Sequence, residues 1–375
     1  MIYADHAATT ALSQAAYEAM LPWFQERYGN PSTLYSLARD PRKAVIAARE
    51  SIALAIGAQP SEIIFTSGGS ESDNLAIKGV AFRYLGERKR FITSEIEHHA
   101  VLHAFDALGR YGFSADILPV NGKGIIGVDK LSKELNAETV LVSIMLANNE
   151  IGTIEPVQAL AEAAHKNGTL FHTDAVQAVG HIPIDVKALG VDLLSASAHK
   201  FNGPKGIGFL YVRNGVVLEP LIHGGGQENG IRAGTENVAG IVGMAVALRE
   251  HIDHMDEECK HLHILQKVLV DALRAADLDF IVNGSSNRIP GNISLSFANV
   301  SGEMLLHRLD LMGISVATGS ACNSKEAEVS HVIRAIGVPP EYALGTIRIS
   351  FGPENTVEDA DKVALCLRKI ICRDQ

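Results

Sequence analysis

The stretch VDLLSASAHKFNGPKGIGFLYV, residues 191–212, decides the fold because it places a polar bend between two apolar runs. The runs VDLLSASA and GIGFLYV are short and rich in apolar residues, which is typical of buried strands. Ser197, His199 and Lys200 occupy the end of the first run and the bend, followed by a cluster of glycine and proline. Buried polar groups are costly unless they face a ligand or each other, so the bend predicts a binding site.

Similar apolar runs alternate with helix-like segments on the N-terminal side of this stretch. The further strand-like runs are EIIFTSG (62–68), RFITSEIE (90–97), ADILPV (115–120), TVLVSIMLAN (139–148) and TLFHTDAV (169–176). Alternation of strands and helices predicts a mostly parallel sheet with helices on both faces. The expected fold class is therefore α/β, built on a mostly parallel, seven-stranded sheet.

The alternation of strand-like and helix-like segments changes after about residue 250. A long amphipathic helix is predicted over 252–276, and the runs DFIVNG, GNISLSF, ISVAT and TIRISFG follow it. These runs predict a smaller α/β unit of antiparallel character. The short run IYAD near the N-terminus cannot form a domain alone, so we expect it on this unit. The predicted division is a large domain at 15–255 and a small domain made of 1–14 and 256–375.

Composition and charge narrow the class of protein. Of the 375 residues, 47% are hydrophobic and 20% charged, which is enough to build a core. The formal net charge of −10 argues against nucleic acid or an anionic membrane surface as the main partner. No apolar run is long enough to span a bilayer and the N-terminus does not resemble a signal peptide, so we expect a cytoplasmic protein. The four cysteines include no C-x-x-C pair and are expected to be reduced thiols.

Polar residues follow five of the predicted strands. Ligands of open α/β sheets bind outside the carboxyl ends of the strands, so these residues are expected to line one crevice. No single member is specific, but the set is. Its members are Gly68, Gly69 and Ser70; His98 and His99; Asn148, Asn149 and Glu150; Asp174 and Gln177; and Ser197, His199 and Lys200.

The turn at Gly68, Gly69 and Ser70 could bind a phosphate group. Free backbone amides at a helix start attract anions, and the helix dipole adds to the attraction. Ser197 and His199 could complete such a phosphate site. The alternative is an ordinary helix start, because Ser70 and Asp73 also fit a capping box.

Asp174 and Lys200 suggest which cofactor carries the phosphate. A buried aspartate needs a cation or donor nearby; Asp174 could cap the next helix or pair with a protonated pyridine nitrogen. A buried lysine tends to lose its proton and becomes a nucleophilic amine suited to Schiff-base chemistry. A phosphate site, an aspartate for a pyridine nitrogen and such a lysine together describe a site for pyridoxal phosphate.

Histidines at 98, 99 and 103 raise the question of a metal site. His99 and His103 are four residues apart, as metal ligands on a helix often are. There is no H-E-x-x-H motif and the spacing suggests no acidic third ligand, so we expect no metal. His98 could stack on the cofactor ring and move protons, or it could simply start a helix.

Motifs along the chain resemble those of the NifS/IscS-type cysteine desulfurases. These enzymes belong to the class V aminotransferase group, within fold type I of the pyridoxal phosphate enzymes. The resemblance runs from about residue 2 to residue 355. It rests on YADHAATT, GNPSTLYSLAR, FTSGGSESDNLAIKG, EIEHHAVL, MLANNEIGTIEP, HTDAVQAVG, SASAHKFNGPKGIGFLYV, GGGQENGIRAGTEN, GSACNS and TIRISFG.

The resemblance implies a role for each site residue. Lys200 would hold the cofactor covalently, Asp174 would pair with its ring nitrogen, and Gln177 would bond its phenolic oxygen. His98 would stack on the ring and act in acid–base steps. The phosphate would be bound by Gly69, Ser70, Ser197 and His199, with Thr235 reaching it from the partner subunit of a homodimer. Asn149 would contact cofactor and substrate, and Arg348 would bind the substrate carboxylate.

Cys322 narrows the reaction. It lies in ATGSACNSKEAEVSHVIRAIG, whose small and polar residues are typical of a loop. The resemblance implies that Cys322 takes the sulfur of L-cysteine as a persulfide and leaves L-alanine. The sulfur would then pass to an acceptor protein for iron–sulfur cluster assembly or tRNA thiolation. The alternatives are a selenocysteine lyase, another class V aminotransferase or lyase, and a phosphate-binding module without catalysis.

Overall fold

The computed structural model describes residues 1–318 and 329–372. Its centre is a sheet of the strands β2 (Ile63–Thr66), β3 (Arg90–Ser94), β4 (Ser114–Leu118), β5 (Thr139–Ser143), β6 (Leu170–Asp174), β7 (Leu193–Ser197) and β8 (Gly208–Val212). The strand order is β2-β8-β7-β6-β5-β3-β4. β8 runs antiparallel to both its neighbours, and the other adjacent pairs are parallel. The predicted mostly parallel, seven-stranded sheet is confirmed.

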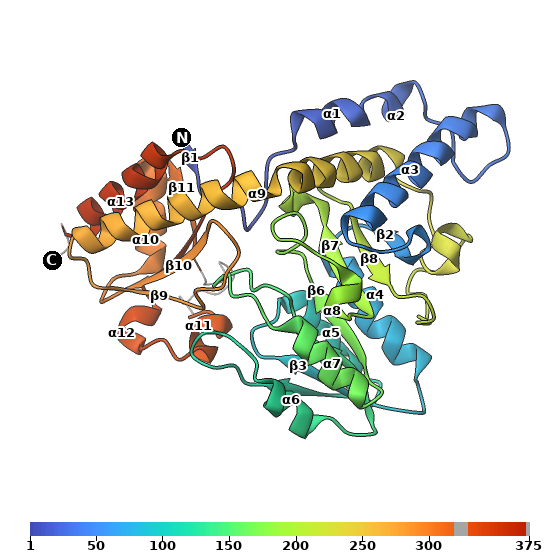
Figure 1. The fold of residues 1–375 in the computed structure, drawn as a ribbon, viewed down its shortest axis with the longest axis horizontal. Coiled ribbons are helices and arrows are strands. Elements are labelled where there is room, and N and C mark those ends of the chain that lie inside the picture. The colour runs from blue at the N-terminus through green and yellow to red at the C-terminus, as the bar shows by residue number, and fades with distance from the viewer. Residues whose placement is uncertain (319–328, 373–375) are drawn as a thin grey trace.

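Helices cover both faces of this sheet, as predicted. Along β8 the side chains alternate: Phe209 and Tyr211 enter one core, and Leu210 and Val212 enter the other. The first core is completed by α3 (Arg39–Ala55), α7 (Val157–Lys166) and the first half of α9 (Val238–Ala275), and the second by α4 (Gly69–Arg83) and α5 (His99–Gly109). Four shorter helices lie around these two cores (Figure 1): α1 (Gln14–Met20), α2 (Pro22–Gln25), α6 (Val128–Glu134) and α8 (Val186–Leu189).

A second sheet lies at the other end of the molecule (Figure 1). Its antiparallel strands, in order, are β12 (Ala317–Thr318), β13 (Thr346–Ser350), β10 (Asn292–Phe297) and β9 (Phe280–Val282). It has its own apolar core with α10 (Gly302–Leu311), α13 (Val357–Ile371) and the second half of α9. Ile2 and Ala4 belong to this core, and β1 (Ile2–Tyr3) pairs with β11 (Ile314–Ser315). The short helix α11 (His331–Ala335) packs Val332 and Ile333 into the first core of the large sheet, and α12 (Pro340–Ala343) contacts β10 of the second sheet.

The helix α9 joins the two parts of the molecule (Figure 1). It begins at Val238, earlier than the helix predicted over 252–276, and it crosses the predicted boundary at residue 255 without a break. The division into domains at that residue stays a prediction. Neither α9 nor any other helix within the described ranges is both long and apolar enough to cross a membrane.

Candidate active site

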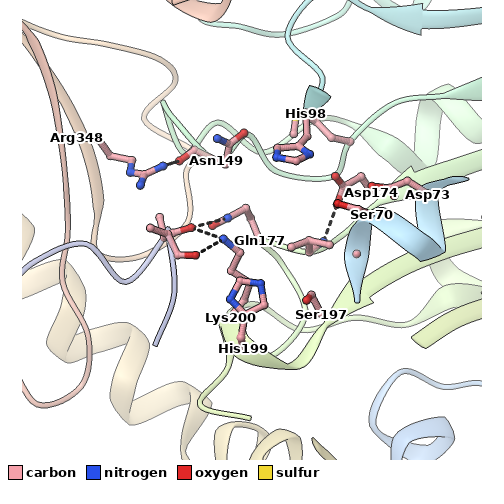
Figure 2. A pocket seen from close by; sticks show the side chains of 15 residues that line it. Ser70, Asp73, His98, Asn149, Asp174, Gln177, Ser197, His199, Lys200 and Arg348 are labelled. Carbon is pink, nitrogen blue, oxygen red and sulfur yellow. Dashed lines mark hydrogen bonds between the residues drawn. The ribbon is translucent and has the colours of Figure 1, made fainter. Parts of the chain in front are cut away.

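A cavity of about 350 Å³ opens at the carboxyl ends of the parallel strands. Figure 2 shows that the labelled side chains point into it from the large sheet on one side and from the small sheet on the other. The structure therefore brings together ten residues that the sequence singled out. They are Gly69, Ser70, His98, Asn149, Asp174, Gln177, Ser197, His199, Lys200 and Arg348.

Lys200 lies at the centre of the cavity. It ends a short 3-10 helix (Ala198–Lys200) that follows β7, so its backbone is fixed by the sheet. Its Nζ donates hydrogen bonds to the backbone oxygens of Ala7 at 2.6 Å and Ala8 at 2.7 Å. Burial, assisted by the positive charge of Arg348, lowers the pKa of Lys200 to about 8. A lysine with such a pKa has a substantial neutral fraction near neutral pH and can act as a nucleophile or base.

Asp174 and Gln177 come from the end of β6 and the loop after it. The carboxyl of Asp174 is 5% exposed and accepts a hydrogen bond from the Val176 amide at 2.9 Å. Burial raises its pKa, while that hydrogen bond and the nearby His98 and Lys200 lower it. Gln177 donates from Nε2 to the backbone oxygen of Ala7 at 2.9 Å. This end of the cavity is lined by buried acid and amide groups.

The opposite end is built from the turn before α4. Gly68 has φ +145°, a conformation that residues with a Cβ rarely adopt, and a Cβ at Gly69 would lie 2.6 Å from Val176. The two glycines therefore let the helix start approach the strands closely. The capping box that Ser70 and Asp73 fit by spacing is not formed: the N-cap of α4 is Gly68, which makes no side-chain cap, and Ser70 is already inside the helix. Ser70 is exposed at this end beside Ser197.

His199 completes this end of the cavity. Its Nδ1 lies 3.2 Å from the hydroxyl of Thr9. Burial, together with the charges of Lys200 and Lys205, lowers the pKa of His199 to about 4. The ring is therefore neutral at pH 7. Backbone amides, hydroxyls and a neutral imidazole form a neutral donor set suited to a phosphate.

His98 is the N-cap of α5. Its Nδ1 accepts the Ala100 amide at 3.1 Å, so the proton of the neutral ring resides on Nε2. Burial lowers the pKa of His98, although the charge of Asp174 opposes that effect. The ring faces the cavity above Asp174 (Figure 2). A neutral ring in this position can stack on a flat cofactor.

Arg348 reaches the cavity from β13 of the small sheet. Its Nη2 pairs with Asp5 at 2.6 Å, and its Nη1 donates to the backbone oxygen of Asn149 at 2.9 Å. Its Nε is buried and has no hydrogen-bond partner within residues 1–318 and 329–372. A buried donor without a partner is costly, so this nitrogen is suited to a ligand carboxylate.

Two predicted residues are not among the described residues that line this cavity. Thr235 is exposed in the segment before α9 and lies outside this cavity, which leaves its predicted contact from a partner subunit as a prediction. Cys322 lies outside the described residues. The backbone oxygens of Ala7 and Ala8 were not predicted for the site, and Asp73, whose side chain lines the cavity, was considered only as part of a possible capping box.

The residues present fit pyridoxal phosphate. The cavity offers neutral donors for a phosphate, a buried acid for a ring nitrogen and an amine of lowered pKa. Asp73, His98 and Asp174 also place possible metal-ligand atoms within 4.8 Å of one another. Because Asp174 lies at the ring end of the cavity, we interpret this group as part of the cofactor site.

Known proteins similar to this chain agree with that interpretation. Residues 2–363 match the family described as aminotransferase class-V. A cysteine desulfurase IscS of Dictyoglomus turgidum is 53% identical over 371 residues, covering 99% of this chain and 94% of the relative. One of Methanosarcina thermophila is 46% identical over 370 residues, covering 99% and 92%.

Solved structures give the same result. A NifS-like protein superposes with a TM-score of 0.94 at 39% identity, covering 99% of each chain. A structure described as SspA in complex with cysteine superposes with a TM-score of 0.84 at 36% identity, covering 95% of this chain and 100% of that one.

The chain therefore belongs to the class V aminotransferase family, with the fold of the type I pyridoxal phosphate enzymes. Within that family it is a NifS/IscS-type cysteine desulfurase, which confirms the resemblance seen in its motifs. Its cofactor is pyridoxal 5′-phosphate, as the prediction from Asp174 and Lys200 required.

Proposed function

We propose that this protein removes the sulfur of L-cysteine, releases L-alanine and carries the sulfur as a persulfide on Cys322. The observation that carries the proposal is the arrangement of Lys200, Asp174 and Arg348 around one cavity. They supply an amine, an acid for a ring nitrogen and a guanidinium for a carboxylate. The relatives named cysteine desulfurase, and the SspA structure that holds cysteine, support the choice of substrate.

The cofactor site divides into three contacts. When bound, pyridoxal phosphate acts as an electron sink for a carbanion at the substrate α-carbon. Lys200 would hold it covalently, Asp174 would pair with its ring nitrogen, Gln177 would bond its phenolic oxygen and His98 would stack on its ring. The groups proposed for the phosphate are Gly69, Ser70, Ser197 and His199, with Thr235 of the partner subunit.

Proton transfer at the substrate α-carbon is assigned to Lys200 or His98. With a pKa of about 8, Lys200 is neutral in about a quarter of molecules at pH 7.5, against about one in a thousand for an ordinary lysine. The oxygens of Ala7 and Ala8 orient its amine. Burial lowers the pKa of His98, and its Nδ1 already accepts the Ala100 amide, so only Nε2 is left to act.

Arg348 and Asn149 would hold the substrate. Asp5 and the backbone of Asn149 fix the guanidinium, and the unused Nε would donate to the substrate carboxylate. This contact orients the substrate without taking part in proton transfer.

The sulfur step is assigned to Cys322. Its thiolate would attack the substrate sulfur, forming an S–S bond while the carbon–sulfur bond breaks. The electrons of that bond return to carbon, which takes up a proton and ends as alanine. The persulfide would pass to an acceptor protein for iron–sulfur cluster assembly or tRNA thiolation. A cytoplasmic location, where thiols stay reduced, suits this chemistry.

A homodimer is proposed as the active form. Large apolar side chains are exposed on and beside α1 and α2, which project from the top of the molecule in Figure 1: Phe24 is 60% exposed, Tyr28 67% and Leu34 96%. Exposed apolar patches mark protein interfaces. A second copy covering them would also supply Thr235 to the phosphate, and the mass of the protein in solution tests this.

The proposed function is tested by replacing Cys322. Cys322→Ser is expected to keep the visible absorption of the cofactor and to lose alanine and sulfide release from L-cysteine. Cys372→Ser, at an exposed thiol, is the matched control and should retain both. Normal release by Cys322→Ser would contradict the proposal. Parallel assays with selenocysteine, and with alanine and a keto acid, separate a selenocysteine lyase and an aminotransferase.

A further inference from the structure

A second buried carboxyl lies beside Asp174. Asp73, in the first turns of α4, is 1% exposed. A carboxyl oxygen of Asp73, one of Asp174 and a ring nitrogen of His98 all lie within 4.8 Å of one another (Figure 2). Oδ1 of Asp73 has no hydrogen-bond partner among the residues that the structure describes. The charge of this carboxyl must therefore be decided by its surroundings.

A chain of hydrogen bonds lies beside Asp73 in the interior of the sheet. Ser143 Oγ lies 2.8 Å from His172 Nδ1, and His172 Nε2 lies 3.0 Å from Ser195 Oγ. Ser195 faces Asp73 and partly opposes the rise in the pKa of that carboxyl.

This chain delivers no positive charge to Asp73. Nε2 of His172 is 3.7 Å from Asp73 Oδ1, but complete burial lowers the pKa of His172 to about 3, so the ring is neutral. The titratable groups that face Asp73 from other elements are Asp174 at the end of β6, Glu97 before α5 and His98 at the start of α5. The first two are acidic, and burial lowers the pKa of His98, so none of the three is a permanent cation beside Asp73.

Asp174 is better placed to carry a negative charge. It accepts the Val176 amide, and His98 and Lys200 face it. Burial and the charge of Asp174 instead raise the pKa of Asp73 well above its usual range. Two buried carboxyls so close together cannot both ionise without a second cation.

We propose that Asp73 is a positioning residue that stays protonated beside Asp174, so that the two carboxyls share one negative charge toward the ring nitrogen of the cofactor. Asp174 carries that charge in the resting enzyme. If Asp174 is neutralised, Asp73 ionises and carries it instead. The inference depends on the pyridoxal phosphate site and not on the desulfurase reaction, so its tests measure cofactor absorption and affinity.

The first test is the visible absorption of bound pyridoxal phosphate in Asp73→Asn, followed between about pH 6 and 10. An amide replaces a neutral carboxyl, so the midpoint of the spectral transition is expected to stay within about 0.3 pH units of the unsubstituted enzyme. If Asp73 were ionised, the substitution would remove a negative charge from a buried site. The midpoint would then fall by about one unit or more, which would overturn the proposal.

The second test is a double-mutant cycle on the affinity of the apoprotein for pyridoxal phosphate. Asp73→Asn alone is expected to weaken binding less than about threefold, and Asp174→Asn about tenfold. Added to Asp174→Asn, the same Asp73→Asn change should weaken binding by at least a further tenfold or so, because no carboxyl is left to ionise. If Asp73→Asn weakened binding by the same small factor with and without Asp174→Asn, the two carboxyls would not share the charge and the proposal would be overturned.

Glu155→Gln is the matched control for both tests. Glu155 is a buried carboxyl whose pKa burial raises to about 8, and it lies outside the cavity. Its replacement should move neither the spectral midpoint nor the affinity. Thermal unfolding of each variant checks folding, and Asp73→Ser, also uncharged, repeats both tests if Asp73→Asn does not fold.

Discussion

The two ends of the cavity hold their ligand in different ways. At the ring end, Asp73 and Asp174 are buried almost completely, and burial raises the pKa of each. At the phosphate end, the glycine turn, Ser70 and His199 lie open to the cavity and are neutral donors. One end therefore depends on a single charge that burial controls, and the other spreads its binding over many weak donors. Substitutions should accordingly be severe at the first end and mild at the second.

The largest loss of activity is expected when Lys200 is replaced. Lys200→Ala removes both the covalent attachment and a base, so activity should fall about 10³-fold or more. The absorption of the bound cofactor should change to that of the free aldehyde. Activity and spectra are measured on the same preparation. Retained activity would exclude Lys200 as the amine that holds the cofactor, and would contradict the assignment of the cavity to pyridoxal phosphate.

The next largest loss of activity is expected at the ring end of the cavity, at Asp174. Asp174→Ala removes the direct partner of the ring nitrogen, and kcat is expected to fall about a hundredfold because the charge that Asp73 then carries supports the electron sink less well than a carboxylate paired with that nitrogen. The kinetics of alanine release measure it, and thermal unfolding shows whether the fold survives. A loss as mild as that of a phosphate-end substitution would contradict the contrast between the ends.

The pH dependence of cofactor uptake tests whether burial controls the charge of Lys200. The pKa of Lys200 is lowered, so its amine becomes neutral at a lower pH than an ordinary lysine. The rate at which apoprotein takes up pyridoxal phosphate should rise about tenfold between pH 7 and 9 and level off above about pH 9, where the amine is mostly neutral. Stopped-flow absorbance measures the rate. A rate still rising steeply through pH 10 would mean that burial does not control this amine.

The smallest effect, a modest loss of cofactor affinity, is expected at the phosphate end of the cavity. Ser197→Ala removes one neutral donor among several, and pyridoxal phosphate affinity should fall only about three- to tenfold, with little change in the spectral midpoint. Equilibrium binding to the apoprotein measures it. A loss larger than that of Asp174→Ala would reverse the order of the two ends.

The sequence predicted the site where neighbouring strand ends meet. Asp174 ends β6, and Ser197, His199 and Lys200 follow β7, so their convergence is a consequence of parallel pairing. Arg348 could be placed only through the resemblance, because it comes from a different sheet. The resemblance likewise carried Thr235 and Cys322, whose roles stay predictions.

Other features depend on contacts that a sequence pattern does not contain. Ala7 and Ala8 hold Lys200 through backbone oxygens, so their side chains give no signal. Asp73 fits a capping box by spacing, but the conformation of Gly68 makes that glycine the N-cap and turns Asp73 into the cavity.

The central claim is that Cys322 accepts the sulfur of cysteine. The most direct test is to mix the holoenzyme with L-cysteine without reductant, digest it and determine the mass of the Cys322 peptide. We predict that this peptide gains one sulfur atom, that a reductant reverses the gain, and that Lys200→Ala abolishes it. Alanine release with an unmodified Cys322 peptide, or sulfur carried only on Cys259, Cys366 or Cys372, would contradict the account.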